Sequence, residues 1–183
     1  MTNTTLTFIT GNAAKAEQLG RHLEMPVHHQ KIDLAEIQSL DLKEVVEHKA
    51  KEAYKFVQKP VLVEDTSLTF NALGKLPGPL IKWFLTELEN AGLSKLLNGY
   101  TDHSAKAEVI FGLYDGSTML FFDGAMEGEI AAGPKGDKGF GWDPVFIPKG
   151  HSKTWGEMDI EEQKETSMRR IALKKLEAYL RSL

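Results

Sequence analysis

Residues 61–85 read VLVEDTSLTFNALGKLPGPLIKWFL, and the fold is expected to form around this stretch. It opens with branched apolar residues, which are typical of a buried strand, and this run ends in Glu64-Asp65-Thr66. Open α/β sheets place their ligands at the carboxyl ends of strands, so we expect both carboxylates at a functional edge. Turn residues follow, and Pro79 is expected to begin a helix that carries Lys82 in its first turn.

The composition is that of a globular domain with one core. The chain has 183 residues, 42% hydrophobic and 26% charged, which fits one two-lobed domain spanning residues 1–183. A net charge of −4 argues against duplex nucleic acid and anionic membranes as partners. Without cysteine there are no disulfides, thiolate zinc sites or cysteine nucleophiles. No secretion signal or long apolar run is found, so we expect a cytoplasmic protein.

The amino-terminal segment predicts a strand, a glycine turn and a helix. Thr4 to Thr10 alternates in polarity, and Gly11 and Asn12 follow, with Asn12 suited to cap the helix. Lys15 then falls in the first helical turn. Backbone N–H groups, a small glycine and a lysine together suit an anion such as phosphate. A capped helix with a solvated lysine is the alternative.

A buried lysine marks the next helix. Ile32 and Leu34 suggest a second strand that ends before Glu36. The apolar stripe from Leu42 to Val57 then has helical spacing, and Lys49 lies in its middle. A lysine on a buried face is unfavourable unless it pairs or reaches the edge of the core. We therefore expect Lys49 to meet an anion, which is either an internal carboxylate or a ligand phosphate.

The second half predicts antiparallel strands. Residues 105–113 alternate strictly, and Asp115-Gly116 is typical of a tight hairpin turn. Residues 119–122 return as a partner strand, and a third strand near residues 127–131 would complete a meander. The fold class is therefore α/β, with a long mixed sheet flanked by helices.

A glycine-rich loop at residues 133–144 carries two aromatic side chains. Phe140 and Trp142 stand between glycines, where they would expose apolar area unless they met a ligand or the core. They suit stacking on a nucleobase, with Asp143 accepting hydrogen bonds from the base edge. The alternative is that both rings pack into the core.

Two further helices are expected. The helix that starts at Pro79 should end near Asn90, before a short helical piece at residues 93–97. The last helix is marked by apolar residues from Met168 to Leu183, and its first turns are expected to hold Lys164, Ser167, Arg169 and Arg170. Positive charge at a helix start is unfavourable unless an anion lies nearby, although a solvated face is the common alternative.

Four blocks of the sequence resemble the inosine triphosphate pyrophosphatase family. They are TGNAAK (10–15), VEDTSLTFNALGKLPGPLIKWFL (63–85), FGWDPVF (140–146) and KETSMR (164–169). The resemblance covers nearly the whole chain in the same order. It implies a Mg²⁺-dependent hydrolase that cleaves ITP, dITP and XTP to the monophosphate and pyrophosphate. It also implies a nucleotide cleft between two lobes and a homodimer.

The resemblance also implies roles for individual residues. Glu36 and Asp65 would hold Mg²⁺, with Asp65 as the proton acceptor. The implied contacts to the phosphates are made by Thr10, Gly11, Asn12, Ala13, Ala14, Lys15, Lys49, Thr66 and Lys82. The implied contacts to the base are made by Phe140, Gly141, Trp142, Asp143, Lys164, Ser167, Met168 and Arg169.

Three positions depart from the family pattern. Met168 stands where the family usually has a histidine that recognises the 6-keto oxygen, and a thioether is only a weak acceptor. Lys75 replaces a common glycine, which implies either strain at positive φ or a different turn. Ser67, where glycine or cysteine is frequent, is a minor change. The alternatives are a nucleotide sensor without turnover and a pyrophosphatase with altered base preference.

Overall fold

The computed structural model describes residues 6–183, which form the following elements. The strands are β1 (Leu6–Ile9), β2 (Val27–Gln30), β3 (Val61–Phe70), β4 (Pro77–Gly78), β5 (Ser104–Tyr114), β6 (Met119–Ile130) and β7 (Phe146–Pro148). The helices are α1 (Ala13–Leu23), α2 (Leu42–Val57), α3 (Ile81–Lys95), α4 (Ile160–Thr166) and α5 (Met168–Arg181), with short 3₁₀ turns at Asn71–Leu73 and Asp143–Val145.

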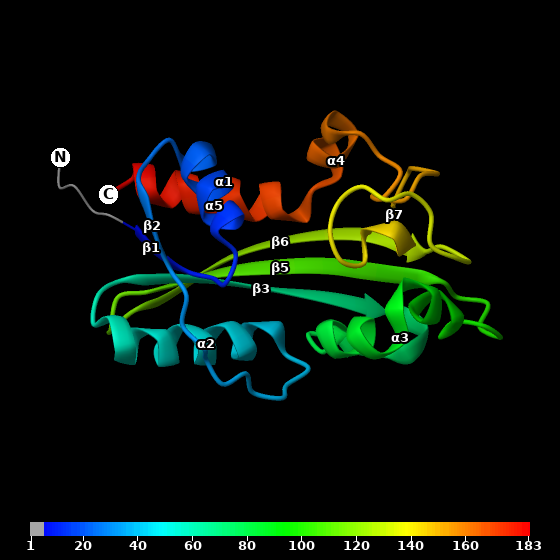
Figure 1. The fold of residues 1–183 in the computed structure, drawn as a ribbon, viewed down its shortest axis with the longest axis horizontal. Coiled ribbons are helices and arrows are strands. Elements are labelled where there is room, and N and C mark those ends of the chain that lie inside the picture. The colour runs from blue at the N-terminus through cyan, green and yellow to red at the C-terminus, as the bar shows by residue number, and fades with distance from the viewer. Residues whose placement is uncertain (1–5) are drawn as a thin grey trace. The chain divides into compact units, whose positions relative to one another are not determined.

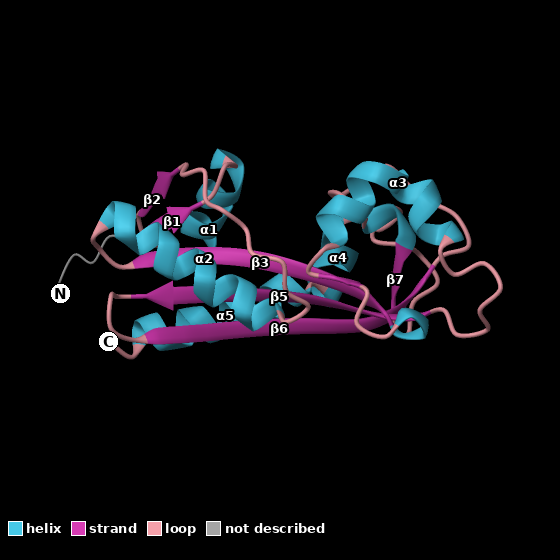
Figure 2. Cartoon of the chain, turned by 90° about the horizontal axis from the view of Figure 1, so that it is seen from below, coloured by secondary structure: helices cyan, strands magenta, loops and turns pink. Residues whose placement is uncertain are grey.

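A mixed sheet flanked by helices confirms the predicted fold class (Figure 1). Within residues 6–183, seven strands follow the order β2-β1-β3-β5-β6-β7, with β4 beside β3. Strand β1 is parallel to β2 and β3, whereas β4 and β7 pair antiparallel to β3 and β6. Figure 2 shows β3, β5 and β6 side by side. The predicted strand residues Thr4 and Thr5 lie outside the described part of the chain.

The chain divides into two compact units. Unit 1 comprises residues 6–65, Ile110–Asp123 and Ala172–Leu183, and unit 2 comprises Thr66–Val109 and Gly124–Ile171. Strands β3, β5 and β6 and helix α5 each contribute a segment to both units.

Unit 1 has its core between α2 and the strands. The predicted stripe is confirmed, because Val46, Ala50 and Ala53 of α2 are fully buried against Val61 and Val63 of β3. Burying a valine side chain contributes about 1.5–3 kcal/mol, so this face anchors the helix. The Asp41 side chain caps α2 by accepting a hydrogen bond from the Lys43 N–H at 2.9 Å. Helix α2 lies on one side of the unit 1 strands, and α1 and α5 lie on the other (Figure 1).

Unit 2 has a core of aromatic and leucine side chains. Phe70, Leu93, Leu97 and Phe146 are fully buried. Helices α3 and α4 lie on opposite sides of the unit 2 strands in Figure 1. The Asp159 side chain and Glu162 form a capping box at the start of α4, which satisfies backbone donors there.

Three strand predictions are wrong in their boundaries. Strand β2 occupies Val27–Gln30, and the predicted strand at Ile32 and Leu34 is irregular chain whose apolar side chains pack against α2. Strand β3 continues to Phe70 instead of ending at Glu64-Asp65, because Leu68 and Phe70 are themselves buried.

Strand β6 runs unbroken through the two separately predicted strands, so β7 is the third antiparallel strand. Gly128 does not interrupt it. A Cβ at Gly128 would lie 2.3 Å from the Ile147 carbonyl oxygen, so glycine is what lets β7 approach.

Helix α3 also differs from its prediction. It begins at Ile81, not Pro79, because Pro77 and Gly78 pair as β4 with Thr69 and Leu68. It continues to Lys95 through a kink at Glu89, so Gly92 lies inside the helix and the segment at 93–97 is mostly its second part. Lys75 is not at positive φ, and Gly74 takes that role with φ 70°. The turn therefore differs from the strained alternative.

Candidate functional site

The predicted site residues fall in both units, and each group is described within its own unit. Unit 1 contains Thr10 to Lys15, Glu36, Lys49 and Asp65, whereas unit 2 contains Thr66, Lys82 and the residues expected to hold the base.

The turn between β1 and α1 forms a helix start at which Asn12 accepts from a backbone N–H. Strand β1 is buried along its length, and the Thr10 N–H donates to the Gln30 carbonyl oxygen at 3.1 Å, which holds the chain to β2 at this point. The Asn12 N–H then donates to Thr10 Oγ1 at 3.2 Å, and the Lys15 N–H donates to Asn12 Oδ1 at 3.4 Å. Helix α1 has no acidic residue in its first turn. Its exposed start, at Gly11 to Ala13, is therefore suited to a negative group.

Glu64 and Asp65 each meet a lysine from a different helix. Lys15 Nζ of α1 lies 3.7 Å from Glu64 Oε1, and Lys49 Nζ of α2 lies 3.0 Å from Asp65 Oδ2. Lys49 Nζ also donates to the Glu64 carbonyl oxygen at 3.2 Å. Successive strand residues point to opposite faces, and α1 and α2 lie on opposite sides of the unit 1 strands. The Glu64 and Asp65 side chains therefore lie on opposite faces of the sheet, Glu64 on the α1 side and Asp65 on the α2 side.

The position of the acid pair along β3 explains how side chains can reach it. Strand β1 pairs with β3 at Val61 and Leu62, and β4 pairs with β3 from Leu68 onward. Glu64 and Asp65 lie between these two pairings. The acid pair thus follows the end of the β1 pairing, whereas β3 itself continues beyond it to Phe70.

Lys49 satisfies the prediction that it meets an anion. Its side chain is 20% exposed, which is low for lysine, and its partner is the internal carboxylate of Asp65. The internal ion pair was one of the two stated alternatives. A ligand phosphate remains compatible with it, because the Asp65 side chain is itself 22% exposed.

Glu36 lies in the irregular segment between β2 and α2. It is exposed, while Ile32 and Leu34 anchor the same segment by packing against the α2 cluster. Among the described residues there is no cluster of three or more histidine, cysteine or acidic side chains suited to hold a metal. A cation here would have to be held by a few carboxylates together with substrate oxygens, as Mg²⁺ commonly is.

In unit 2, Thr66 and Lys82 occupy different elements. Thr66 follows Asp65 on β3 and is half-buried. Lys82 is the second residue of α3, exposed, with Nζ 5.8 Å from the centre of the Trp83 ring. It lies in the first turn of the helix as predicted, although the helix starts two residues later than Pro79.

The glycine-rich loop is folded tightly on its own aspartate. Gly139 and Gly141 have φ of 80° and 64°, and a Cβ on Gly139 would lie 2.1 Å from Asp143 Oδ2. The Phe140 N–H donates to that same oxygen. Burial raises the pKa of Asp143 to about 6, which outweighs the lowering effect of this hydrogen bond.

The two aromatic residues of the loop divide between the stated alternatives. The Phe140 residue is 76% exposed, as a residue that stacks on a ligand would be. Trp142 is 8% exposed and contacts Phe146 and Trp155, with ring centres 5.9 Å and 5.6 Å away. The Trp142 ring therefore follows the core-packed alternative, whereas Phe140 follows the exposed one.

The basic segment near the last helix is divided by a break. Lys164 belongs to the end of α4 and pairs with Glu161 at 2.7 Å, so its prediction in the first turn of the last helix is wrong. Ser167 ends α4 in an extended conformation, and α5 starts at Met168. Met168 is 9% exposed, while Arg169 is half-buried. The Met168 side chain is therefore mostly buried, and little of it faces solvent.

Sequence reasoning missed Asn90 and Trp155. Asn90 Nδ2 donates to the Gly141 carbonyl oxygen at 2.9 Å across 51 residues of sequence, and no local pattern indicates such a contact. Trp155 contacts the loop residue Trp142. An apolar tryptophan inside a polar stretch, residues 151–157, is a signal that could have identified it.

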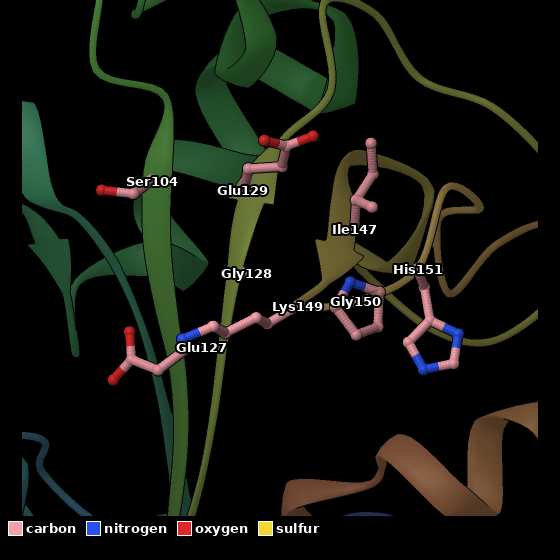
Figure 3. A pocket seen from close by; sticks show the side chains of 9 residues that line it. Ser104, Glu127, Gly128, Glu129, Ile147, Lys149, Gly150 and His151 are labelled. Carbon is pink, nitrogen blue, oxygen red and sulfur yellow. The ribbon is translucent and has the colours of Figure 1, made fainter.

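A separate pocket lies on the unit 2 strands. It has a volume of about 480 Å³, and Glu127, Glu129, Lys149 and His151 are among its lining residues (Figure 3). An adjoining pocket of about 540 Å³ shares Ser104, Glu129 and Ile147 with it. No predicted site residue lines either pocket. The predicted site residues and the residues that line these two pockets are therefore different sets.

The fold is a mixed α/β sheet with helices on its faces. Its candidate site combines the exposed start of α1 with two adjacent carboxylates of β3, each of which pairs with a lysine. The chain belongs to the Ham1 family, whose family model matches residues 6–179. It is 43% identical over 182 residues to inosine triphosphate pyrophosphatase 2 of Trypanosoma cruzi, covering 97% of this chain and 92% of that protein.

Solved structures show the same fold. A HAM1 protein from Coxiella burnetii has a TM-score of 0.87 at 25% identity, over 98% of this chain and all of that one. A structure from Mycobacterium abscessus titled nucleoside-triphosphatase or dITP/XTP pyrophosphatase has a TM-score of 0.81 at 24% identity, over 94% and 98% of the two chains. No helix within residues 6–183 is long and apolar enough to cross a membrane.

Proposed function

We propose that this protein hydrolyses deaminated purine nucleoside triphosphates, namely ITP, dITP and XTP, to the monophosphate and pyrophosphate. The observation that carries the proposal is the pairing of Lys15 with Glu64 and of Lys49 with Asp65, two adjacent residues of β3. A triphosphate needs cations and helix N–H groups to bind, and its hydrolysis needs a carboxylate that takes a proton from water. Membership of the Ham1 family supports the same activity.

Lys49 and Asp65 have linked roles in this proposal. Asp65 orients the attacking water and accepts its proton, and Lys49 holds the Asp65 side chain in place through the 3.0 Å contact. Lys15 extends from the first turn of α1 to Glu64 at 3.7 Å, so it can offer positive charge to phosphate oxygens. The exposed Lys82 would add charge from α3.

We further propose that Mg²⁺ is the metal, held by Glu36 and Asp65. Both are hard oxygen donors, and Mg²⁺ typically binds through one or two carboxylates plus waters and substrate phosphates. When bound, the ion would neutralise phosphate charge and make water more acidic. Two carboxylate side chains have the chemistry that such a site needs.

The base would be recognised by unit 2. The exposed Phe140 ring offers a stacking surface, and Asp143 offers an acceptor for the N1–H of a 6-keto purine, which adenine lacks. Ser167 and Arg169 would contribute polar contacts. The buried Met168 favours a second candidate, a pyrophosphatase with weaker discrimination against ATP. We also propose a homodimer, as the family resemblance implies, and a location in the cytoplasm.

The test is pyrophosphate release from a panel of ITP, dITP, XTP and ATP, with and without Mg²⁺. Release from the deaminated nucleotides only with Mg²⁺ is expected. Comparable rates with ATP would favour the second candidate, and no release from any nucleotide would favour a sensor without turnover.

Asp65→Asn is expected to lower turnover by a factor of about 100 to 10,000, the usual contribution of general base catalysis, while ITP binding measured by calorimetry persists. Asp123→Asn is the matched control, because Asp123 pairs with Lys175 at 3.0 Å and its side chain is 66% exposed. Undiminished turnover in Asp65→Asn would remove Asp65 from the catalytic role.

A further inference from the structure

One buried hydrogen bond joins Trp155, which packs against the glycine-rich loop, to Thr166, the last residue of α4. Trp155 Nε1 donates to Thr166 Oγ1 at 2.8 Å, and these residues are only 6% and 4% exposed. Both ends of the bond lie in unit 2. Thr166 immediately precedes Ser167, Met168 and Arg169, so the bond fixes the residue next to the polar contacts expected at the base.

The other side of Trp155 is tied to the loop. Its ring centre lies 5.6 Å from that of Trp142 and 4.5 Å from that of Phe146. Its backbone N–H donates to the Phe146 carbonyl oxygen at 3.0 Å, and the Gly156 N–H donates to the Asp143 carbonyl oxygen at 3.0 Å. Trp155 and Gly156 therefore form a strut between the loop that carries Phe140 and Asp143 and the end of α4.

Thr166 is held from several directions at once. Its hydroxyl donates to the Glu162 carbonyl oxygen at 3.1 Å and lies 3.8 Å from the Met158 sulfur. The hydroxyl can accept from the indole while it donates back to its own helix. Gln163 Nε2 donates to the Trp155 carbonyl oxygen at 2.7 Å, which is a second link between α4 and the strut.

We propose that Trp155 and Thr166 are a positioning pair that sets base selectivity, because their hydrogen bond holds the loop at Phe140–Asp143 in register with Ser167–Arg169. This inference rests on the proposed function and names residues that do not themselves touch the nucleotide. Misplacement of a recognition group by about 1 Å can change rates by up to about 100-fold, so a coupling of this kind has a measurable effect.

The experiment compares steady-state kinetics with ITP and ATP for Thr166→Val, Thr166→Ser and Trp155→Phe. Valine keeps the shape of threonine and removes the hydroxyl, whereas serine keeps the hydroxyl. We expect KM for ITP to rise about tenfold in Thr166→Val and Trp155→Phe. The value of kcat should change less than about twofold, because the residues proposed to bind the triphosphate are unchanged. The ITP to ATP ratio of kcat/KM should fall in the same two variants. In Thr166→Ser, KM for ITP and this ratio should stay close to the wild-type values.

A double variant separates positioning from stability. Thr166→Val leaves a buried indole N–H without a partner, and adding Trp155→Phe removes that donor. Trp155→Phe should lower Tm less in the Thr166→Val background than in wild type, and the double variant should keep the raised KM. Val109→Ala in β5, fully buried, is the control for a loss of stability without a loss of the bond.

Two results would overturn the positioning role: an unchanged KM and selectivity in Thr166→Val, or an equal rise of KM in Val109→Ala. Both are read against the wild-type enzyme. If the wild type releases no pyrophosphate from ITP, the proposed function itself has failed. If the wild type hydrolyses ITP and the variants leave KM and selectivity unchanged, only the positioning role has failed.

Discussion

Asp143 is a carboxyl group held in an unfavourable setting for its charge. Burial raises its pKa to about 6 from the ordinary value of 3.8, and its Oδ2 receives the Phe140 N–H. Between these two values the folded protein binds more protons than the unfolded chain. The free energy of unfolding therefore falls as pH rises from about 4 to about 6, by about 2–3 kcal/mol for this group.

Asp143→Asn should remove this pH dependence. We expect the variant to unfold at a higher denaturant concentration than wild type at pH 7.5, where Asp143 is charged, and to match wild type near pH 4. Urea unfolding at several pH values measures the difference. A constant difference across this pH range would contradict the raised pKa.

The charge of Asp143 should also affect the nucleotide. Because the ionised form accepts the N1–H of a 6-keto base, KM for ITP should rise as pH falls through about 6. KM for ATP, which lacks that proton, should change less. Both follow from pyrophosphate release measured between pH 5 and 8.

Met168 gives a second prediction about a single side chain. Met168→His introduces a donor where only a weak thioether acceptor stands, so the ITP to ATP ratio of kcat/KM should increase. Met168→Leu is the control of similar volume and should leave the ratio unchanged. The residue is 9% exposed, so Tm must be checked for both variants. An unaltered ratio in a folded Met168→His protein would refute the prediction.

Single residues differed in how far their sequence context revealed them. Lys49 was identified because a charge interrupts an apolar stripe, and its ion pair confirms that reasoning. The glycine-rich loop left open whether Phe140 and Trp142 are exposed or packed, and in the structure Phe140 is exposed while Trp142 is buried. Asn90 gave no signal, since its partner is 51 residues away.

Among the helices, α3 carries backbone strain at its kink. Glu89 has φ 54° and ψ −179°, a region that almost only glycine adopts and that costs about 1–3 kcal/mol for other residues. The kink separates the first part of the helix, which carries Lys82, from Asn90, whose side chain binds the loop.

Glu89→Gly should therefore stabilise the protein by about 1 kcal/mol, because glycine relieves the strain and more than offsets its own entropy loss. Glu87→Gly, at an exposed helical position two residues earlier, should instead destabilise by about 1 kcal/mol. Chemical denaturation of the two variants makes the comparison. Equal losses in both would show that the Glu89 conformation is unstrained.

Helices and strands with a clear hydrophobic periodicity were predicted well. Element boundaries that depend on pairing with another strand were not. The stripe of α2 and the alternation of β5 depend on burial within one element, so the sequence reveals them. The extent of β3, by contrast, depends on β1 pairing at one end and β4 at the other. Partners distant in sequence decide such limits.

At the level of the complete chain, we expect the proposed metal to serve the reaction and not the fold. No cluster of three or more metal-ligating side chains occurs within residues 6–183, and both units have apolar cores. EDTA should therefore abolish pyrophosphate release while leaving Tm unchanged. A fall of several degrees in Tm on chelation would reveal a structural metal.

Nucleotide should stabilise the protein when the metal is present. A non-hydrolysable ITP analogue at 100 times its Kd, with Mg²⁺, adds about 2.7 kcal/mol and should raise Tm by about 5–10 °C. The same analogue with EDTA should raise it less. Thermal unfolding followed by fluorescence gives both values.

The order of residues along the chain determined the class of fold and indicated a candidate anion site before α1, because both depend on local spacing and composition. Folding decided which lysine meets which carboxylate, which ring of the loop is buried and which residues brace it. These are contacts between segments far apart in sequence, and a strand that alternates its side chains sends adjacent acids to helices on opposite faces.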